Sequence, residues 1–191
     1  MKVKEIFAQH IFSKCFLDFD TNYLSQLQAS IELIRRGDVQ GAVISNREFG
    51  WHSKGLPQNG PFEILTQQIT KKAYEFCKEL KNFNFNKIEM DSLWANINYE
   101  GDINWPHIHS SDIAGVFYID VHDNCGNLRL ESYTYNNHHK LSHYLQQINQ
   151  IEIKPENNLL VLFDSNCYHF VGKNSSKKPR ISMSFNIKIY D

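Results

Sequence analysis

The sequence predicts an α+β fold in which two helices buttress a double β-sheet of the jelly-roll type. Two stretches in the first half of the chain show the apolar spacing of amphipathic helices. From residue 88 onward, short apolar or alternating segments follow one another closely, as strands do in a jelly roll. Helices followed by a run of strands are typical of α+β domains.

The two predicted helices lie between residues 22 and 80. In the first, Leu24, Leu27, Ile31 and Ile34 recur at helical spacing until Gly37, which we expect to cap the helix. The second helix has one apolar stripe opposite Gln, Lys and Glu residues, made of Phe62, Leu65, Ile69, Ala73, Phe76, Cys77 and Leu80. Segment 43–60 between the helices is rich in Gly, Pro, Asn and Ser, which predicts a loop.

We expect one or two short strands within residues 3–17 and a longer series of strands after residue 87. The series comprises residues 88–99, 107–109, 113–121, 127–133, 159–163, 168–172 and 180–190. Segment 134–150 interrupts it, because its apolar residues recur at helical spacing and predict a short helix. We expect three histidines of that segment to lie at the surface: His138, His139 and His143. The alternative is that the segment forms a lid over a pocket.

Length and composition indicate one globular domain spanning residues 1–191. The chain has 41% hydrophobic residues and a net charge of -1, which argues against a nucleic-acid binder with a broad basic surface. Its basic cluster at 173–180 is expected to be a solvated loop. No apolar run is long enough for a membrane helix, and the four isolated cysteines predict free thiols in a reducing cytoplasm.

The most informative local pattern runs from residue 94 to residue 118. Trp94, Asn96 and Asn98 alternate with apolar residues and predict a strand with one polar face. A polar turn then leads to His107 and His109, whose spacing places both imidazoles on one face of a strand. Both rings can therefore reach one metal ion.

Two patterns far downstream strengthen a site at this strand. His169 follows His107 by 62 residues, after an apolar segment that breaks at a turn. The last segment alternates cleanly, and its polar face begins with Arg180 and Ser182. A guanidinium offers a planar pair of donors that matches a carboxylate, and the nearby hydroxyl points the same way. The pattern therefore predicts a carboxylate clamp.

This order of HxH, a distal His and RxS resembles the layout of iron(II) and 2-oxoglutarate dependent oxygenases, whose usual order is HxD/E, distal His and Arg-x-Ser. More narrowly, the sequence is similar to a phage and bacterial group of 2OG-Fe(II) oxygenases. The resemblance rests on GWHS at 50–53, WANINYEGDINWPHIH at 94–109, AGVFY at 114–118, HFV at 169–171 and RISMSFN at 180–186. It implies a double-stranded β-helix, which is a jelly-roll or cupin-like barrel.

The resemblance also implies an Fe(II) site. His107 and His169 match the two histidines of the family pattern, while His109 stands where the pattern has Asp or Glu. Three neutral imidazoles would leave the iron site one unit more positive than the usual triad. Asp112, from the following turn, is the alternative third ligand, and Asp102 is a less favoured one.

The co-substrate implied by the resemblance is 2-oxoglutarate, with ascorbate as an accessory reductant. Arg180 and Ser182 would hold its far carboxylate, and Tyr118 would be a second hydroxyl donor unless it is a core aromatic residue. Asn98 would orient ligands or contact the substrate. The reaction implied is oxidative decarboxylation of 2-oxoglutarate to succinate, coupled to hydroxylation of a substrate.

The substrate does not follow from the sequence. The aromatic candidates for the pocket rim are Trp51, His52, Tyr99 and Trp105. Such side chains do not show whether the substrate is a peptide, a base or a metabolite. From the loop alone we expect the aromatic residue of GWHS to pack into the core, and the rim role of Trp51 and His52 is what the resemblance suggests. The expected partner is thus a small molecule or a peptide, with no nucleic-acid or membrane signature, and a homodimer is left open.

Two other functions fit part of the pattern. Gly101 followed by the HxH pair matches the opening of a cupin motif, although no Glu stands near residue 113 or 114. A three-His metalloenzyme that does not use 2-oxoglutarate would leave Arg180 and Ser182 without a role. A non-catalytic jelly-roll binding module would show no dependence on metal.

Overall fold

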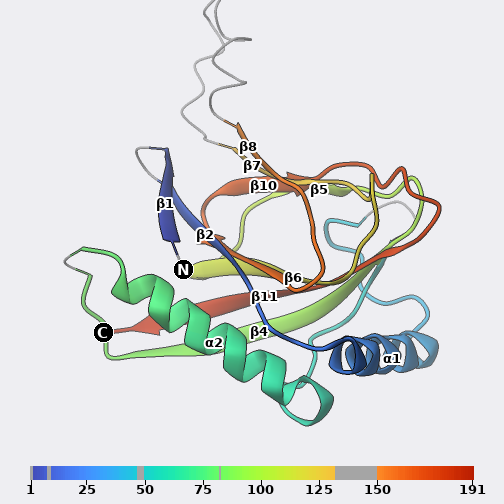
Figure 1. Ribbon diagram of the computed structural model, residues 1–191, viewed down its shortest axis with the longest axis horizontal. Helices are drawn as coiled ribbons and strands as arrows, with labels where there is room; N and C mark the ends of the chain where they lie inside the picture. The colour runs from blue at the N-terminus through green and yellow to red at the C-terminus, as the bar shows by residue number, and fades with distance from the viewer. Residues whose placement is uncertain (1, 8–9, 47–49, 82, 132–149) are drawn as a thin grey trace, which may run out of the picture.

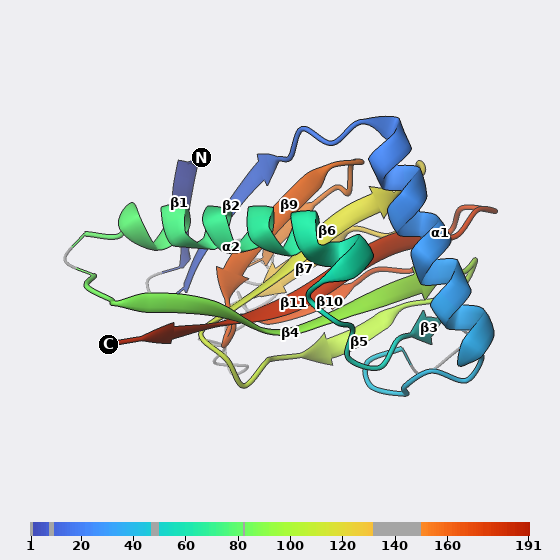
Figure 2. The same ribbon diagram turned by 90° about the horizontal axis from the view of Figure 1, so that it is seen from below.

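The computed structural model describes residues 2–7, 10–46, 50–81, 83–131 and 150–191. Its described elements form three layers, with two helices under a large sheet and a small sheet above it (Figure 1). The helices are α1 (Thr21–Gly37) and α2 (Glu63–Lys78), and the short 3-10 helix η1 (Gly60–Phe62) precedes α2. Seen from below, both helices lie across the same face of the large sheet (Figure 2).

The large sheet has seven antiparallel strands in the order β1-β2-β9-β6-β11-β4-β3. These strands are β1 (Lys2–Phe7), β2 (His10–Phe16), β9 (Leu159–Asp164), β6 (Ile113–Asp120), β11 (Arg180–Tyr190), β4 (Lys87–Asn98) and β3 (Trp51–His52). The long pair β11 and β4 forms the middle of the sheet, with Arg180 opposite Asn98 and Tyr190 opposite Lys87.

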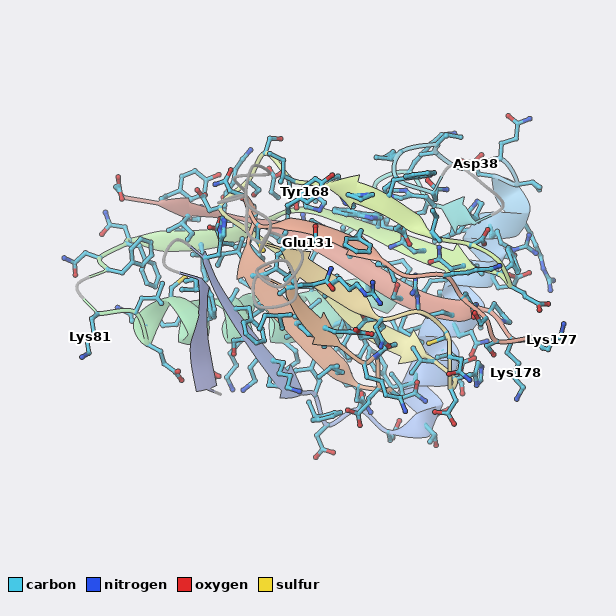
Figure 3. The ribbon with its side chains drawn as sticks, turned by 90° about the horizontal axis from the view of Figure 1, so that it is seen from above. Asp38, Lys81, Glu131, Tyr168, Lys177 and Lys178 are labelled. Carbon is cyan, nitrogen blue, oxygen red and sulfur yellow. The ribbon has the colours of Figure 1, made fainter. Side chains whose placement is uncertain are left out.

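The small sheet has the order β5-β10-β7-β8, with β5 (Asn104–His107), β10 (Tyr168–Val171), β7 (Leu128–Glu131) and β8 (Gln150–Ile153). Figure 3 shows it from above, with Glu131 of β7 and its register partner Tyr168 of β10 labelled. Lys177 and Lys178 project from the molecule's edge in the same view, and Lys177 pairs with Glu100 at 2.8 Å. This exposed loop agrees with the solvated loop expected for the basic cluster.

The two faces of the large sheet bury different side chains. Toward the helices, Ile181, Met183, Phe185 and Ile187 of β11 join an apolar core with both helices and β4. The polar face of β11 turns toward the small sheet, and a second apolar cluster lies beside it, built from β6, β9 and β7. The alternation of the sequence therefore predicted the sidedness of β11 correctly.

The described helices form for the reasons the sequence indicates. Asp20 caps α1 by accepting a hydrogen bond from the Tyr23 backbone N–H at 2.7 Å. Leu27 and Ile31 of α1 are fully buried. Gly37 is the last helical residue, and Asp38 rather than Gly37 occupies the C-cap position. The prediction of the cap was therefore wrong by one residue.

Two strands were not predicted. β3 has two residues and β8 has four, so neither contains enough alternation to stand out from its flanking loops. The predicted short helix at 134–150, with His138, His139 and His143, lies outside the described residues except for Gln150, which begins β8. None of the helices in the described part of the chain has the length and apolar character needed to cross a lipid bilayer.

Candidate active site

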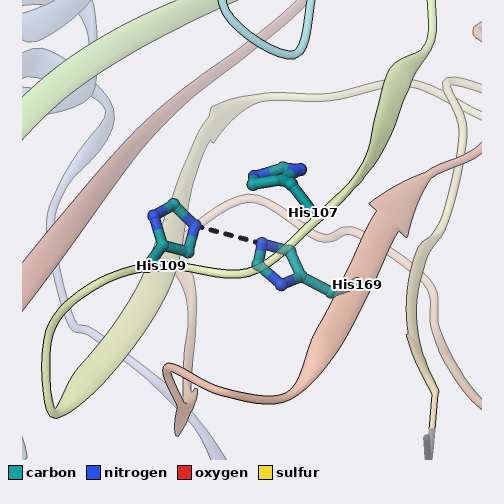
Figure 4. A group of neighbouring side chains, drawn as sticks. All are labelled: His107, His109 and His169. Atoms are coloured by element: carbon teal, nitrogen blue, oxygen red, sulfur yellow. Dashed lines mark hydrogen bonds between the residues drawn. The ribbon is translucent and has the colours of Figure 1, made fainter.

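Three histidines from separate segments meet at one end of the small sheet. His107 of β5 and His169 of β10 are register partners across the two strands. His109 lies beyond the end of β5, so the predicted strand 107–109 was wrong, and a hydrogen bond from the His109 backbone N–H to the Ser165 carbonyl at 3.0 Å holds this residue. The candidate ligand atoms of the three rings lie within 4.8 Å of one another, and the three rings face a common point (Figure 4).

Backbone carbonyls orient two of these rings. The His169 Nδ1 lies 2.9 Å from the Cys167 carbonyl, and the His107 Nδ1 lies 2.6 Å from the Trp105 carbonyl. Because a carbonyl only accepts, both Nδ1 atoms carry the proton and both Nε2 atoms keep a free lone pair. Such a partner on the second nitrogen is what metal-binding histidines usually have.

The three imidazoles are neutral. Burial, together with the neighbouring imidazoles of His107 and His52, lowers the pKa of His109 to about 4. Burial likewise lowers the pKa of His107, and it lowers that of His169 well below the ordinary value. Neutral imidazole is the form that binds metal ions, so the rings are ready to act as ligands at neutral pH.

The spacing of two of the three nitrogens fits a single ion, and the third ring offers its ligand atom within 4.8 Å of them. The Nε2 atoms of His109 and His169 are 3.2 Å apart. Two nitrogens that each lie about 2.1 Å from one ion are separated by about 3.0–3.4 Å in octahedral or tetrahedral geometry. The residues present therefore fit a divalent transition metal, for which three imidazoles are suitable ligands.

The described carboxylates do not join this group. Asp112 is exposed, and its carboxylate accepts a hydrogen bond from the Ile189 backbone N–H at 2.8 Å, at the far end of β11. Asp102 is buried, and its carboxylate accepts from the Tyr99 backbone N–H at 2.6 Å. The structure therefore brings His109, and not Asp112 or Asp102, to His107 and His169.

A cavity of about 440 Å³ lies between the sheets and contains the three histidines. Its walls include the polar faces of β4 and β11 and the apolar residues of β6 and β9. Its lining side chains from these strands are Ser92, Leu93, Trp94, Asn96, Val116, Tyr118, Phe163, Arg180, Ser184 and Asn186. The cavity thus joins the candidate metal ligands to Arg180.

Arg180 is 2% exposed and is held by four oxygen atoms. One terminal nitrogen donates to the amide oxygens of Asn98 at 2.7 Å and Asn104 at 3.2 Å. The other donates to the carbonyls of Cys125 and Gly126, both at 3.1 Å. The Nε atom is buried without a hydrogen-bond partner among the described residues. The guanidinium is therefore fixed in place while one of its donors is unused.

The positive charge of Arg180 has no contacting counter-ion in the described part of the chain. All four of its hydrogen-bond acceptors are neutral, and the negative charge of Asp102 acts on it only from a distance. Burial lowers the pKa of Arg180, but guanidinium stays protonated in proteins. A buried cation without a paired anion is costly, so the arrangement favours an anionic ligand.

Gly126 is required beside Arg180. Its φ of +89° is a backbone conformation that other residues adopt with strain. A Cβ atom at this position would lie 2.1 Å from the Gly172 carbonyl oxygen and 3.2 Å from the Arg180 guanidinium. A side chain at position 126 would therefore collide with the Gly172 backbone and shift the turn whose Cys125 and Gly126 carbonyls hold Arg180.

The structure treats the two predicted hydroxyl donors differently. Tyr118 lines the cavity and is 1% exposed, and burial raises its pKa to about 12 against the opposing charge of Arg180. Its phenol therefore stays protonated and can donate. Ser182 is also buried, but it lies within the sheet between Asn96 and Tyr118 rather than in the cavity wall.

Of the four predicted rim residues, only His52 lines the cavity. Trp51 is buried in the core beside the helices, where its indole N–H donates to the Asp38 carbonyl at 2.8 Å. Tyr99 packs against the same core. Trp105 is 45% exposed and lines a neighbouring hollow. Trp51 thus packs into the core, as the loop alone had predicted, and the rim prediction was wrong for Tyr99, because an aromatic residue alone does not reveal which way its side chain points. Trp105 shares its hollow with Ile44, Ser45 and His107 of the cavity, so its rim role stays a prediction.

Sequence reasoning missed two groups at this site. Trp94 lines the cavity, with its ring 5.6 Å from that of His109, although the alternation of β4 already placed it on the polar face. The Cys125 and Gly126 carbonyls that hold Arg180 leave no signal in side-chain identity, apart from the glycine itself in a polar turn.

The fold and the site together define a two-sheet protein with a three-histidine candidate metal site that shares its cavity with a buried arginine. Residues 92–186 match the model of the family described as "Putative 2OG-Fe(II) oxygenase". The chain belongs to this family, as the motifs had indicated. No curated protein sequence matches the chain.

Solved structures of 2-oxoglutarate oxygenases share the fold, which is a double-stranded β-helix. A prolyl-4-hydroxylase from Pseudomonas putida is 13% identical, with a TM-score of 0.64 over 94% of both chains. A prolyl hydroxylase from Trichoplax adhaerens, in complex with a peptide fragment, is 12% identical, with a TM-score of 0.65 over 94% of this chain and 83% of that one. The alpha ketoglutarate dependent carbocyclase SnoK from nogalamycin biosynthesis is 9% identical, with a TM-score of 0.68 over 94% and 79%.

Proposed function

We propose that this protein couples the oxidative decarboxylation of 2-oxoglutarate to the hydroxylation of a second substrate, using Fe(II) held by His107, His109 and His169. The observation that carries the proposal is the sharing of one cavity. Three neutral imidazoles with converging nitrogens line the same space as Arg180, a buried cation without a contacting carboxylate. Membership of the oxygenase family supports the same reaction.

The histidines would hold the ion in a fixed orientation. The Cys167 and Trp105 carbonyls keep the protons of His169 and His107 on Nδ1, so each Nε2 is available without rearrangement. Bound Fe(II) would supply the dioxygen chemistry of this enzyme class, which no protein side chain provides. The chain's own contribution is to orient the reactants and to exclude water.

Arg180 would bind the far carboxylate of the co-substrate. The four oxygens that hold it fix the plane of the guanidinium before a ligand arrives, which lowers the entropy lost on binding. Tyr118 lines the same part of the cavity and would donate its phenol proton to that carboxylate. Asn98 would act through Arg180, and Ser182 would support Tyr118 from within the sheet.

A ligand with two acidic ends suits this layout. Arg180 and the three histidines line the same cavity, so one end of a keto diacid would lie at the histidines while the other meets the arginine. A ligand with a single acidic group would contact either the histidines or Arg180, but not both.

One observation favours a different function. No carboxylate of the described residues joins the three histidines, so the ligand set also suits a three-His metalloenzyme that does not use 2-oxoglutarate. In that case Arg180 would have no anionic ligand to bind.

The test is an anaerobic titration. Fe(II) and 2-oxoglutarate together should give a weak visible charge-transfer band, and exposure to oxygen should then yield succinate. Arg180→Ala should weaken 2-oxoglutarate binding by about 100-fold or more while Fe(II) binding persists. Arg129→Ala is the matched control, since Arg129 lies on β7 outside the cavity. A band that forms equally well without 2-oxoglutarate, or with Arg180→Ala, would reject the proposal.

The substrate and the place of action belong to the same proposal. We propose a peptide or a small molecule as substrate, and the peptide complex of a similar fold supports including peptides. We also propose a reducing compartment such as the cytoplasm. All four cysteines are free, and Cys77, Cys125 and Cys167 are buried. Unpaired thiols are what proteins of that compartment usually contain.

A further inference from the structure

His52 is a buried histidine on the cavity wall that neither the metal site nor the co-substrate site uses. It lies in β3 at the edge of the large sheet and is 5% exposed. Its Nδ1 lies 2.6 Å from the Ser53 carbonyl, so the proton is on Nδ1. Its Nε2 is an acceptor without a hydrogen-bond partner among the described residues.

The position of the His52 ring is fixed before any ligand binds. The ring stacks on Trp94 with a centroid distance of 5.7 Å and an angle of 14°. Trp94 in turn contacts His109, so His52 lies one aromatic ring away from a candidate metal ligand. The backbone of His52 is held as well, because it pairs with Asn96 of β4 and its carbonyl accepts from Ala42 at 2.8 Å.

The imidazole of His52 is neutral. Burial lowers its pKa, and the hydrogen bond to the Ser53 carbonyl opposes that shift only in part. A neutral ring with its proton on Nδ1 offers one acceptor and no donor to the cavity. A buried acceptor of this kind binds a ligand that brings an O–H or N–H group.

The charges on the cavity wall restrict the ligand further. Among the described lining residues, only Arg180 and Lys54 carry a charge, and none is acidic. Arg180 is assigned to the co-substrate, and Lys54 is 73% exposed and paired with Asp38 at 2.8 Å. An ammonium group would find no counter-ion here, and a phosphate would find no cluster of basic groups.

We propose that His52 orients the substrate by accepting a hydrogen bond from an uncharged O–H or N–H group next to the carbon that reacts. The substrate is therefore a neutral hydroxyl- or amide-bearing compound or residue, and not a cation or a phosphate ester. The Trp94 and Phe163 rings supply apolar surface for the rest of it. This inference rests on the proposed function and names its class of substrate.

Four probes on one scaffold test the class. Benzamide carries an N–H donor, N,N-dimethylbenzamide carries none, and benzoate and benzylammonium add a negative and a positive charge. Binding to the full chain, without metal and again with Ni(II) and 2-oxoglutarate, is measured by ligand-observed NMR. Histidine ring labelling then shows whether the His52 resonance shifts. Benzamide should bind at least tenfold more tightly than the other three probes, and it should shift His52.

Two variants separate the hydrogen bond from the ring stack. His52→Phe keeps a ring on Trp94 but lacks the acceptor, and benzamide should bind about tenfold more weakly. His52→Gln restores an acceptor and should bind benzamide within threefold of the wild type. His122→Phe is the matched control, because His122 lies in a different hollow. It should bind benzamide as the wild type does.

The outcomes distinguish this inference from the proposed function. Equal benzamide binding by wild type and His52→Phe would overturn the role of His52. In the protein loaded with Ni(II) and 2-oxoglutarate, where Arg180 is occupied, tighter binding of benzylammonium or benzoate than of benzamide would overturn the substrate class. A failure of all four probes to bind would overturn it as well. Failure of the charge-transfer band in the wild type would instead overturn the oxygenase proposal, whatever the probes do. Loss of that band in His52→Phe alone would show that His52 supports the metal site rather than the substrate.

Discussion

The two faces of β11 are both buried, yet they contain opposite chemistry. Met183, Phe185 and Ile187 are fully buried against the helices and β4. On the other face, Arg180 and Ser182 are 2% and 3% exposed. Burying apolar surface stabilises the fold, whereas burying polar groups does so only when they are paired. The comparison teaches that one face of this strand maintains the fold and the other maintains a binding site.

The largest expected effect lies on the apolar face. Phe185→Ala should lower the free energy of unfolding by about 3–5 kcal/mol, because it removes a fully buried ring from the main core. Ser184→Ala, its neighbour on the other face, loses one hydrogen bond from Asn96 and should cost only about 1 kcal/mol. Urea unfolding measures both. Equal losses would show that the two faces do not differ in this way.

The second effect concerns the choice of metal ligand. His109→Ala should weaken Fe(II) binding by at least about 100-fold, because loss of a direct ligand exceeds the effect of removing an outer partner. Asp112→Ala should leave metal affinity unchanged, since its carboxylate is bonded to the Ile189 backbone. Calorimetric titration under anaerobic conditions compares the two. Loss of metal binding in Asp112→Ala alone would reverse the assignment.

The third effect concerns the geometry of Arg180 rather than its charge. Arg180→Lys keeps a cation but loses the fixed guanidinium plane and its unused Nε–H donor, and 2-oxoglutarate should bind about tenfold more weakly. Lysine also cannot reach four acceptors from one fixed plane. Arg129→Lys should change nothing in the same titration. An unchanged affinity in Arg180→Lys would mean that charge alone holds the co-substrate.

The smallest effect is a pH dependence of the metal-free protein. Folding lowers the pKa of His109 from 6.5 to about 4, so the unfolded chain binds more protons between these values. The contribution of His109 to the free energy of unfolding is therefore fully present above pH 6.5 and is lost as the pH falls toward 4. Urea unfolding at pH 7, 6 and 5 should show this decline, and His109→Asn should reduce it. Stability that rises on acidification over this range would contradict the neutral state of the histidines.

Strand alternation was the part of the sequence that carried the most structural information. It placed Trp94, Asn96 and Asn98 on one face of β4 and Arg180 and Ser182 on one face of β11, and the structure agrees. The period of two decides these faces wherever one side packs on an apolar core. Motif spacing also predicted that His107, His109 and His169 would meet.

Contacts made by loops and by backbone atoms could not be predicted from the sequence. Asp112 stands just before β6, so no alternation fixes its direction, and its carboxylate is held by the backbone of β11 instead. The surroundings of Arg180 depend on two carbonyls of a turn, which any residue could supply. Trp51 and Trp105 are the same residue type, yet Trp51 is buried in the core and Trp105 is exposed. Side-chain identity does not distinguish such cases when long-range packing decides them.

The register of β5 and β10 gives the metal site a second consequence. β5 lies at the border of the small sheet, and His107 faces His169 directly across the ladder. An ion shared by these two side chains would cross-link the edge strand β5 to its neighbour β10. Loading the protein with metal should then slow the exchange of amide hydrogens in β5 and β10 with heavy water. The bound ion would in this way also keep β5 and β10 paired beside the cavity.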